Sequence, residues 1–427
     1  MLSCPTKRLS PLVREFLPAA LDVAGAAGAT LLSPFLLWKL LTVPRWRCGF
    51  AERFALKLPS QPLRDVVWIH AVSAGELLTA EPLLRGLRQA LPSCPLFLTV
   101  TTEAGHVLAR ERLPDIPHTF WPVDFSWSVR RLLGSLRPRL VVLLELELWP
   151  NFLLAAEKFG VPVVVVNGRI TERTARRWRR LPPLARFLFN LVDHFAVQNE
   201  QYACRLRSLG VIPGKISVCG NLKFDVPRNE SAPVLPLRDR LRAQAAAPIL
   251  VGGCTHPGEE ALLVDLAKRL GGLPLVLAPR HLERVEEVER LVRNAGLQPC
   301  RLTDGGTGDV LIVDAFGRLD SIYRSADLVV MGGTFVPHGG HNMLEPARWG
   351  KAVVFGPSID NFRDIAVGLL AHDAAVQVPG PPGLEAALAE LVRDPQKRKA
   401  YGRRALEVWR QGQGSVKRYV AVVKSFL

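Results

Sequence analysis

The chain has 427 residues, of which 48% are hydrophobic and 22% charged, a composition typical of a folded protein. Because one hydrophobic core rarely grows beyond about 250–300 residues, we expect two domains. Lys and Arg number 55 against 39 Asp and Glu, and the net charge of +16 favours anionic partners. The sequence has no zinc-finger, RNA-binding or basic-zipper pattern, so nucleic acid is the weaker interpretation of this charge. The 7 cysteines include no CxxC pair, which argues against a disulfide framework and favours a reducing compartment.

An apolar stretch from Phe16 to Trp38 stands near the start of the chain and is interrupted by one acid, Asp22. Basic residues flank it on both sides, among them Lys7 and Lys39. Its charge-free part, residues 23–38, is shorter than the roughly 20 residues that a membrane-spanning helix needs. We expect a retained membrane anchor or an interfacial helix rather than a cleaved signal peptide. A helix buried in a soluble domain is the alternative.

After this segment, short apolar runs rich in β-branched residues alternate with amphipathic stretches, and the alternation restarts near Pro248. Continuous apolar strands with helices between them predict parallel sheets that are covered on both faces. The fold class is therefore α/β, with two Rossmann-like domains facing a central cleft. The expected boundaries are residues 1–45 for the anchor segment, 46–226 for the first domain, 227–237 for a Pro-rich linker, and 238–427 for the second domain, whose last helix packs back on the first.

The segment WIHAVSAGE runs from an apolar strand at Trp68 to a carboxylate, Glu76, where a helix should begin. Doubly wound sheets bind ligands at this carboxyl edge, and the small residues leave room for a substrate. A helix start favours an ionised Glu76 that is ready to accept a proton. The alternative is an ordinary first-turn acid, and this motif taken alone favours that alternative.

Two further motifs of the first half place charged residues near strand ends. ELELWPN begins at Glu145, directly after an apolar strand, and carries a second acid, Glu147. Glutamate is seldom buried without a partner, so the pair indicates either a substrate site or a salt bridge to an arginine. GNLKFD carries Lys223, which would meet a phosphate or carboxylate in the cleft, or else is a solvated linker lysine.

The longest glycine-rich segment is GGTFVPHGGHNMLEPA, which starts at Gly332 directly after an apolar strand. A helix that begins near Asn342 would offer backbone N–H groups to a phosphate, and Glu345 on its first turn would accept from sugar hydroxyls. A capping arrangement without a ligand is the alternative. The segment also holds His338 and His341, but no acid or thiol stands at metal-ligand spacing, so we expect no metal.

Two shorter motifs of the second half also follow strands. APRH places Arg280 at the same sheet edge as the glycine-rich loop, and FGRLDSIY places Phe316 where it would lie beside a base. In isolation, turn or packing roles are the more common explanation of such residues.

Taken together and in this order, the motifs resemble those of the bacterial Kdo (3-deoxy-D-manno-octulosonic acid) transferases. The resemblance extends from about Trp46 to the C-terminus and is carried by VSAGE, ELELWPN, VQNE, GNLKFD, THPGEE, PRH, GGHNMLEPA and GPSIDNFRDI. It implies a GT-B glycosyltransferase that moves Kdo from CMP-Kdo to a lipid A precursor (lipid IVA) with inversion, without cofactor or metal. It also implies work at the cytoplasmic face of the bacterial inner membrane, on an anionic lipid surface and not on nucleic acid.

The resemblance assigns roles to individual residues. Glu76 matches the family's general base, and Glu145 and Lys223 match positions that stabilise the transition state. The segments that match the family's CMP contacts are Pro279 and Arg280, then Phe316, Gly317 and Arg318, then Asn342, Met343, Leu344 and Glu345. One departure is that Arg318 stands where the family usually has glutamate.

Two other functions are compatible with the sequence. One is a GT-B enzyme that uses another activated sugar, such as a UDP-sugar, and competition between nucleotides would separate the two. The other is a non-catalytic protein that binds anionic lipid, which the paired Glu76 and Glu345 argue against.

Overall fold

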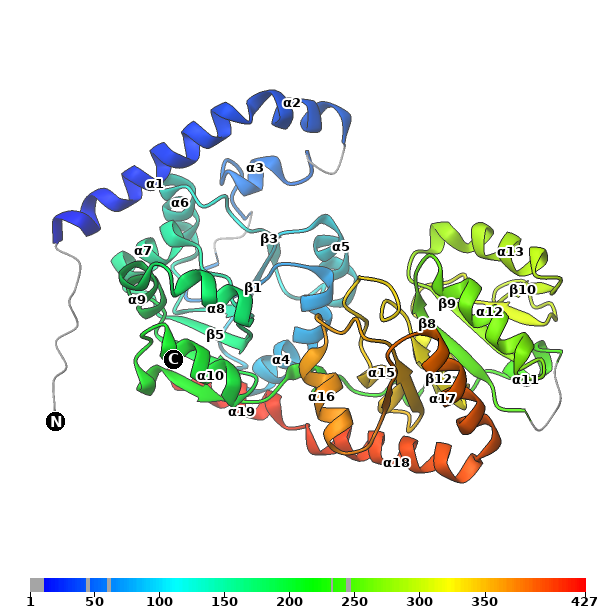
Figure 1. Cartoon of the computed structure of the whole chain (residues 1–427). Coiled ribbons are helices and arrows are strands. Elements are labelled where there is room, and N and C mark those ends of the chain that lie inside the picture. Colours follow the sequence, from blue (N-terminus) through cyan, green and yellow to red (C-terminus); the bar gives the residue numbers. More distant parts are fainter. Residues whose placement is uncertain (1–10, 44–46, 60–62, 232, 243–246) are drawn as a thin grey trace. The chain divides into compact units, whose positions relative to one another are not determined.

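The computed structural model describes residues 11–43, 47–59, 63–231, 233–242 and 247–427. The chain forms two compact units, of which the first comprises Met1–Val226 with Gln413–Leu427 and the second Pro227–Gly412. Each unit is built on a parallel sheet of 7 strands with helices around it (Figure 1). The predicted α/β fold class with two Rossmann-like units is confirmed.

In the first unit the strand order is β3-β2-β1-β4-β5-β6-β7. Val67 of β1 pairs with Leu96 of β2 on one side and with Leu140 of β4 on the other. Strand addition therefore changes direction between β1 and β4, the point at which doubly wound sheets bind ligands. The strands are β1 (Val67–Ala71), β2 (Leu96–Val100), β3 (His118–Phe120), β4 (Leu140–Leu144), β5 (Val163–Gly168), β6 (His194–Val197) and β7 (Ile216–Val218).

Helices cover both faces of this sheet, which explains why the strands are continuously apolar. Successive side chains of β1 enter different cores: Trp68 joins one apolar cluster, and Val67 and Ile69 join the other. The helices after the N-terminal segment are α3 (Phe50–Arg53), α4 (Ala74–Ala90), α5 (Glu103–Arg112), α6 (Ser126–Leu136), α7 (Pro150–Phe159), α8 (Glu172–Trp178), α9 (Pro182–Asn190) and α10 (Glu200–Ser208), with the 3-10 turns η2 (Pro213–Lys215) and η3 (Leu222–Asp225).

The N-terminal segment forms two helices, α1 (Pro11–Leu31) and α2 (Ser33–Thr42), rather than one. Its internal acid explains how α1 is held: the Asp22 carboxylate accepts from the Ser126 N–H at 2.8 Å and from the Asn151 amide at 3.0 Å. Among the described residues, no single helix is long and apolar enough to cross a membrane. Two consecutive helical segments, Phe16–Leu31 and Ser33–Lys39, are together long and apolar enough for a span, but the chain bends between them. The flanking Lys7 lies outside the described residues.

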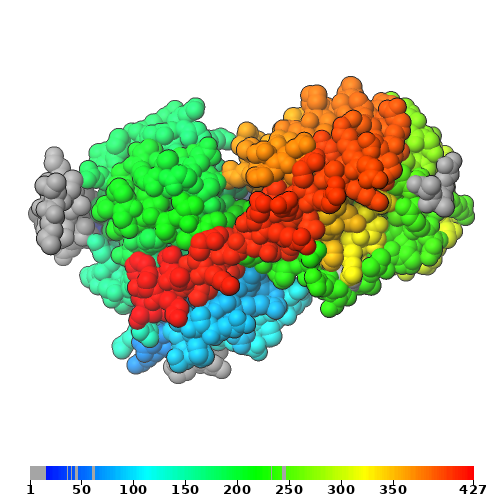
Figure 2. Space-filling view, turned by 90° about the horizontal axis from the view of Figure 1, so that it is seen from below, coloured from blue at the N-terminus to red at the C-terminus, as the bar shows by residue number. Residues whose placement is uncertain are grey.

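The C-terminal tail is divided between the units. Helix α18 (Pro395–Gln411) belongs to the second unit, whereas α19 (Ser415–Lys424) belongs to the first and packs along α4, as Figure 2 shows for the red end of the chain. Residues of GNLKFD hold it there. The Asp225 carboxylate accepts from the N–H groups of Gly414 and Val416 at 2.6 and 2.7 Å, and the Tyr419 hydroxyl donates to a backbone carbonyl of the motif.

The second unit repeats the architecture with the strand order β10-β11-β9-β8-β12-β13-β14. Here β8 lies between β9 and β12, so the reversal point is the carboxyl edge of β8 and β12. The strands are β8 (Leu250–Thr255), β9 (Leu275–Pro279), β10 (Pro299–Arg301), β11 (Val310–Ile312), β12 (Leu328–Met331), β13 (Ala352–Phe355) and β14 (Val376–Gln377). The helices are α11 (Leu237–Arg240), α12 (Glu259–Arg269), η4 (Leu282–Arg284), α13 (Val285–Asn294), α14 (Leu319–Ser325), α15 (Leu344–Ala347), α16 (Arg363–Ala371), α17 (Pro381–Arg393) and α18.

Candidate active site

Glu76 stands at the carboxyl edge of β1, on the first turn of α4, as the sequence predicts. Ser73 is the N-cap, and its hydroxyl accepts from the Glu76 N–H at 3.3 Å. The Glu76 Oε2 atom accepts in turn from the N–H of Val72 at 2.8 Å. This capping exchange fixes the carboxylate at the strand-to-helix turn and still leaves Oε1 for another partner. The structural role and the catalytic role are therefore compatible in one residue.

The protonation of Glu76 differs from the sequence-based expectation. Burial, followed by the nearby Glu145 carboxylate, raises the pKa of Glu76 to about 7, although the Val72 N–H opposes the shift. Desolvation and a like charge therefore outweigh the helix dipole on which the sequence-based expectation relied, and Glu76 is only partly ionised near neutral pH. A carboxylate poised near pH 7 has the proton affinity that suits a general base.

Glu145 comes directly after β4, the strand next to β1, and its N–H donates to Val166 O at 2.9 Å. Its φ is 56°, in the left-handed region that non-glycine residues rarely adopt, and such strain concentrates at functional sites. Burial and then Glu145 raise the pKa of Glu147 as well. The structure thus brings Glu76, Glu145 and Glu147 into one carboxylate cluster, as their common sheet edge predicts.

Lys223, the third predicted catalytic residue, lies on η3, which packs against α4. Its N–H donates to the side chain of Asn221 at 3.0 Å. The same turn is secured at Leu222, whose N–H donates to Asn167 Oδ1 at 3.1 Å. GNLKFD is therefore a structured turn beside the helix that carries Glu76, and its capping of α19 is a second role that the sequence did not reveal.

In the second unit, a buried carboxylate organises the glycine-rich loop. Glu259, from THPGEE, accepts from the N–H groups of Gly333, Thr334 and Phe335 at 2.7, 3.1 and 3.0 Å, and from that of His256 at 2.9 Å. Burial raises the pKa of Glu259 while these N–H groups lower it. One side chain from the first turn of α12, the helix that follows β8, therefore fixes the loop after β12. Sequence reasoning left this role undetected because Glu259 is an ordinary first-turn acid by position.

The loop brings three imidazoles together. His256 Nε2 and His341 Nε2 lie 2.8 Å apart, and the His256 and His338 rings are 4.0 Å apart between centroids. Burial, and then neighbouring histidines, lower the pKa of His256 to about 4. Burial, with His256 as the next cause, lowers that of His341 to about 3. Only His338 and His341 are close together in the sequence, and the pairing of β8 with β12 brings His256 to them.

The segment at Asn342 differs in one respect from the expectation. Helix α15 has only 4 residues, so the predicted helix dipole is weak, and Asn342 Oδ1 accepts from the Leu344 N–H at 3.2 Å. The Gly340 N–H is also engaged, by Gly333 O at 2.8 Å. Within the described residues, the N–H groups from His341 to Met343 have no such partner. These three loop amides, rather than a helix end, are the donors available to an anion.

Glu345 lies beside these amides, and the Asn342 amide donates to its Oε1 at 3.4 Å. Burial raises the pKa of Glu345, whereas Arg348 lowers it. Arg348 is itself paired with Asp320 at 2.5 Å, and among the described residues no cation forms an ion pair with Glu345. The carboxyl group is therefore held in place by a neutral amide and remains free to accept from a ligand.

The other predicted nucleotide contacts lie at the same sheet edge or on the loop after β11. Pro279 ends β9, and the exposed Arg280 follows it with its N–H donated to Thr255 O at 3.0 Å. Phe316 is 77% exposed, an unusual state for an aromatic ring. Gly317 and Arg318 are also exposed, whereas Met343 and Leu344 are buried, so these two offer their backbone rather than their side chains.

Comparison with known proteins bears on this arrangement. Residues 47–226 match the family described as 3-Deoxy-D-manno-octulosonic-acid transferase (kdotransferase). A 3-deoxy-D-manno-octulosonic acid transferase of Chlamydia muridarum is 31% identical over 400 residues, covering 91% of this chain and 93% of the relative. The chain belongs to the Kdo transferase family. It is therefore a glycosyltransferase.

Other members of the Kdo transferase family match at similar levels. The 3-deoxy-D-manno-octulosonic acid transferase of Haemophilus influenzae is 29% identical over 397 residues, covering 90% of this chain and 92% of the relative. A bifunctional glycosyltransferase/methyltransferase of Fusobacterium nucleatum is 31% identical over 371 residues, and the match spans 82% of this chain but only 55% of that protein.

Solved structures agree with the fold. A putative UDP-N-acetylglucosamine 2-epimerase from Listeria monocytogenes has a TM-score of 0.60 at 14% identity, covering 85% of this chain and 96% of that one. The UDP-GlcNAc 2-epimerase from Neisseria meningitidis has a TM-score of 0.58 at 13% identity, covering 85% of this chain and 100% of that one. At these identities the likeness shows the fold alone, which is of the GT-B type.

Proposed function

We propose that this Kdo transferase moves Kdo from CMP-Kdo to a lipid A precursor, lipid IVA, and inverts the anomeric centre. The observation that carries the proposal is Glu76, a carboxylate with a pKa of about 7 at the reversal point of the first sheet. Family membership supports Kdo as the transferred sugar, and the site chemistry supports an attacking hydroxyl group.

In the proposed reaction, a lipid hydroxyl oxygen forms a bond to the anomeric carbon of Kdo while the bond from that carbon to the CMP phosphate breaks. The hydroxyl proton passes to Glu76 Oε1, because Oε2 is already held by the Val72 N–H. The phosphate oxygen leaves with the bonding electrons as CMP. One base and a favourable electrostatic environment are sufficient for such a displacement, and no protein nucleophile is required.

The nucleotide belongs to the second unit in this proposal. The free N–H groups from His341 to Met343 would bind the phosphate oxygens, and Arg280 would add charge. Glu345 would accept from the ribose hydroxyls, which requires a carboxylate that is not already paired with a cation. Exposed Phe316 would lie beside the base. No metal enters this scheme, since backbone N–H groups and a guanidinium supply the positive charge.

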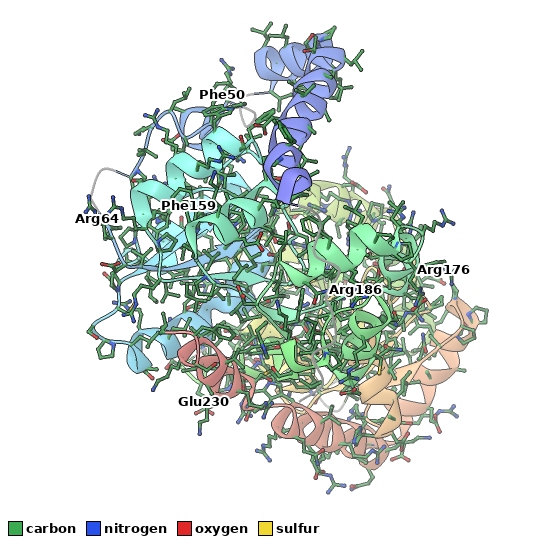
Figure 3. The ribbon with its side chains drawn as sticks, turned by 90° about the vertical axis from the view of Figure 1, so that its left-hand side faces the viewer. Phe50, Arg64, Phe159, Arg176, Arg186 and Glu230 are labelled. Atoms are coloured by element: carbon green, nitrogen blue, oxygen red, sulfur yellow. The ribbon has the colours of Figure 1, made fainter. Side chains whose placement is uncertain are left out.

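An anionic membrane surface is the proposed partner of the first unit. The N-terminal helices expose Val23, Leu31 and Trp38 by 70, 83 and 54%, a concentration of apolar surface that is typical of membrane contact. Helices α8 and α9 and the turn between them add exposed arginines, two of which Figure 3 labels; the set is Arg173, Arg176, Arg177, Arg180 and Arg186. Apolar insertion with arginine contacts to lipid phosphates favours binding at the cytoplasmic leaflet.

Initial rates of CMP release from CMP-Kdo with lipid IVA test the proposal, and a UDP-sugar serves as the competing donor. Glu76→Gln should lower the rate by roughly 10²–10⁴, the usual effect of losing a general base. Glu103→Gln is the matched control, because Glu103 is also a first-turn acid after a strand but is exposed. Turnover of the UDP-sugar alone, or equal rates in the two variants, would contradict the proposal.

A further inference from the structure

Three histidines of the second unit converge although they come from distant parts of the chain. His256 follows β8, while His338 and His341 belong to the loop after β12, and their ligand atoms all lie within 4.8 Å of one another. His256 is buried, His341 is half-buried and His338 is exposed, so the cluster has a closed end and an open end. An ion would enter at His338 and would retain a coordination position toward solvent.

The spacing suits a small divalent ion. Zinc–imidazole bonds of about 2.0–2.1 Å in tetrahedral geometry place ligand nitrogens about 3.3 Å apart. His256 Nε2 and His341 Nε2 are already 2.8 Å apart, slightly closer than this. The other distances between ligand nitrogens are at most 4.8 Å, so they need to shorten by no more than about 1.5 Å. His338 is the exposed member of the cluster, so its side chain can rotate toward the other two.

The contact between His256 and His341 also fixes their chemistry. Two imidazole nitrogens at 2.8 Å share one proton, so one ring donates and the other presents a lone pair. An ion placed between them would replace that proton and bind both lone pairs.

The scaffold around the cluster is rigid, which distinguishes it from histidines that meet by chance on a surface. The Glu259 carboxylate holds the backbone of His256 and of Gly333. A Cβ atom at Gly333 would lie 3.1 Å from His341 and 3.4 Å from His338, so this glycine leaves the space that the two rings occupy. Ligands fixed by their own backbone contacts are the arrangement that metal sites require.

We propose that His256, His338 and His341 bind one divalent transition-metal ion of the zinc class, with a fourth position open to water or to an anionic oxygen. Imidazole ligands select zinc, cobalt, nickel and copper over magnesium and calcium, which prefer oxygen. The sequence-based expectation of no metal depended on the lack of a third ligand near His338 and His341, and His256 supplies that ligand. This proposal does not rest on the proposed transfer reaction.

The test uses full-length, untagged protein that has been stripped of metal by a chelator, because a polyhistidine tag would bind the same ions. Titration with ZnCl2 in a calorimeter should give one site with a Kd tighter than about 1 μM. Addition of Co²⁺ should give the intense visible absorption of a tetrahedral site. Mg²⁺ should give neither signal.

Two variants test whether the ion binds at the three histidines. His338→Ala removes an exposed ligand and should weaken zinc binding by more than about 100-fold, since losing even an outer-sphere partner costs 10–100-fold. His281→Ala is the matched control, because its ring lies 5.9 Å from that of His256 but is not part of the cluster, and zinc affinity should stay within about threefold. Thermal melting of both variants checks that they fold.

Two results would overturn the proposal. Failure of the folded wild-type protein to bind zinc at one site would show that the cluster is not a metal site. Binding that survives in folded His338→Ala would place the ion elsewhere. If His338→Ala instead weakened CMP binding while the wild type bound no metal, the histidines would serve the anionic donor directly.

Discussion

Replacement of Glu76 by glutamine should make the enzyme slower and also more stable at alkaline pH. The pKa of Glu76 in the fold is about 7 against an ordinary value of 4.5, so the fold favours the protonated acid. The resulting contribution to stability is complete below about pH 4.5 and is lost as the pH rises through about 7. Glutamine is neutral throughout and retains an oxygen that accepts from the Val72 N–H. The variant should therefore not suffer this loss.

The magnitude follows from the same two values. The difference between 4.5 and about 7 corresponds to about 3 kcal/mol, and solvent screening of the half-buried carboxylate reduces this to about 1–2 kcal/mol. At pH 8.5, Glu76→Gln should unfold with a free energy about 1–2 kcal/mol above that of the wild type. At pH 4.5 the two proteins should be equal. The activity of the wild-type enzyme should depend on pH in the opposite direction to its stability. Its kcat/KM should fall as the pH drops below an apparent pKa near 7, because the base becomes protonated.

Calorimetric unfolding from pH 4.5 to 8.5, combined with kcat/KM over the same range, measures both effects. Glu103→Gln, which replaces an exposed acid, provides the reference variant. Parallel stability curves for wild type and Glu76→Gln would show that the carboxylate is not desolvated. A wild-type kcat/KM that stays flat through pH 7 would show that ionisation of Glu76 does not limit the reaction. Either result would contradict the role proposed for Glu76.

Four further predictions concern other parts of the molecule. Glu345→Ala should weaken CMP binding by roughly 10–150-fold in calorimetry, whereas Glu76→Gln should change it little, and equal losses would contradict the assignment of the nucleotide to the second unit. Asp225→Ala removes two hydrogen bonds from the start of α19 and should lower the free energy of opening of that helix by about 2 kcal/mol or more in hydrogen exchange. Deletion of residues 1–41 should leave a foldable enzyme that binds anionic vesicles less well, and unchanged binding would remove the anchor from the account. Arg318→Glu, which introduces the residue that the sequence resemblance leads one to expect there, should change CMP affinity by less than about fivefold, because the side chain is exposed.

The sequence predicted the fold well because its signals are local. Apolar β-branched runs identified the central strands, and the parallel arrangement then placed Glu76 and Glu145 at one edge without further information. The same reasoning placed Arg280 and the glycine-rich loop at the edge of the second sheet. Position along a strand is therefore sufficient to predict which residues share a sheet edge.

Properties that depend on packing between distant segments were not predictable. The pKa of Glu76 reflects burial, which no local pattern encodes. In the sequence, Asp22 only interrupts an apolar segment. In the structure, its carboxylate accepts a hydrogen bond from Ser126 and so joins α1 to α6. His256 lies beside the other two histidines only because β8 pairs with β12, and no local sequence pattern encodes that pairing. Asp225 had no predicted role, because its partners Gly414 and Val416 lie at the start of α19, near the far end of the chain.

The mass of the lipid product decides whether this enzyme transfers Kdo to lipid, because CMP release alone does not separate transfer from hydrolysis. Lipid IVA incubated with CMP-Kdo and the wild-type enzyme should gain the mass of one or more Kdo residues, and the Glu76→Gln enzyme should yield roughly 10²–10⁴ times less of this product in the same time. Unmodified lipid IVA alongside free Kdo and CMP would show hydrolysis without transfer. That result, or full product formation by folded Glu76→Gln, would contradict the account.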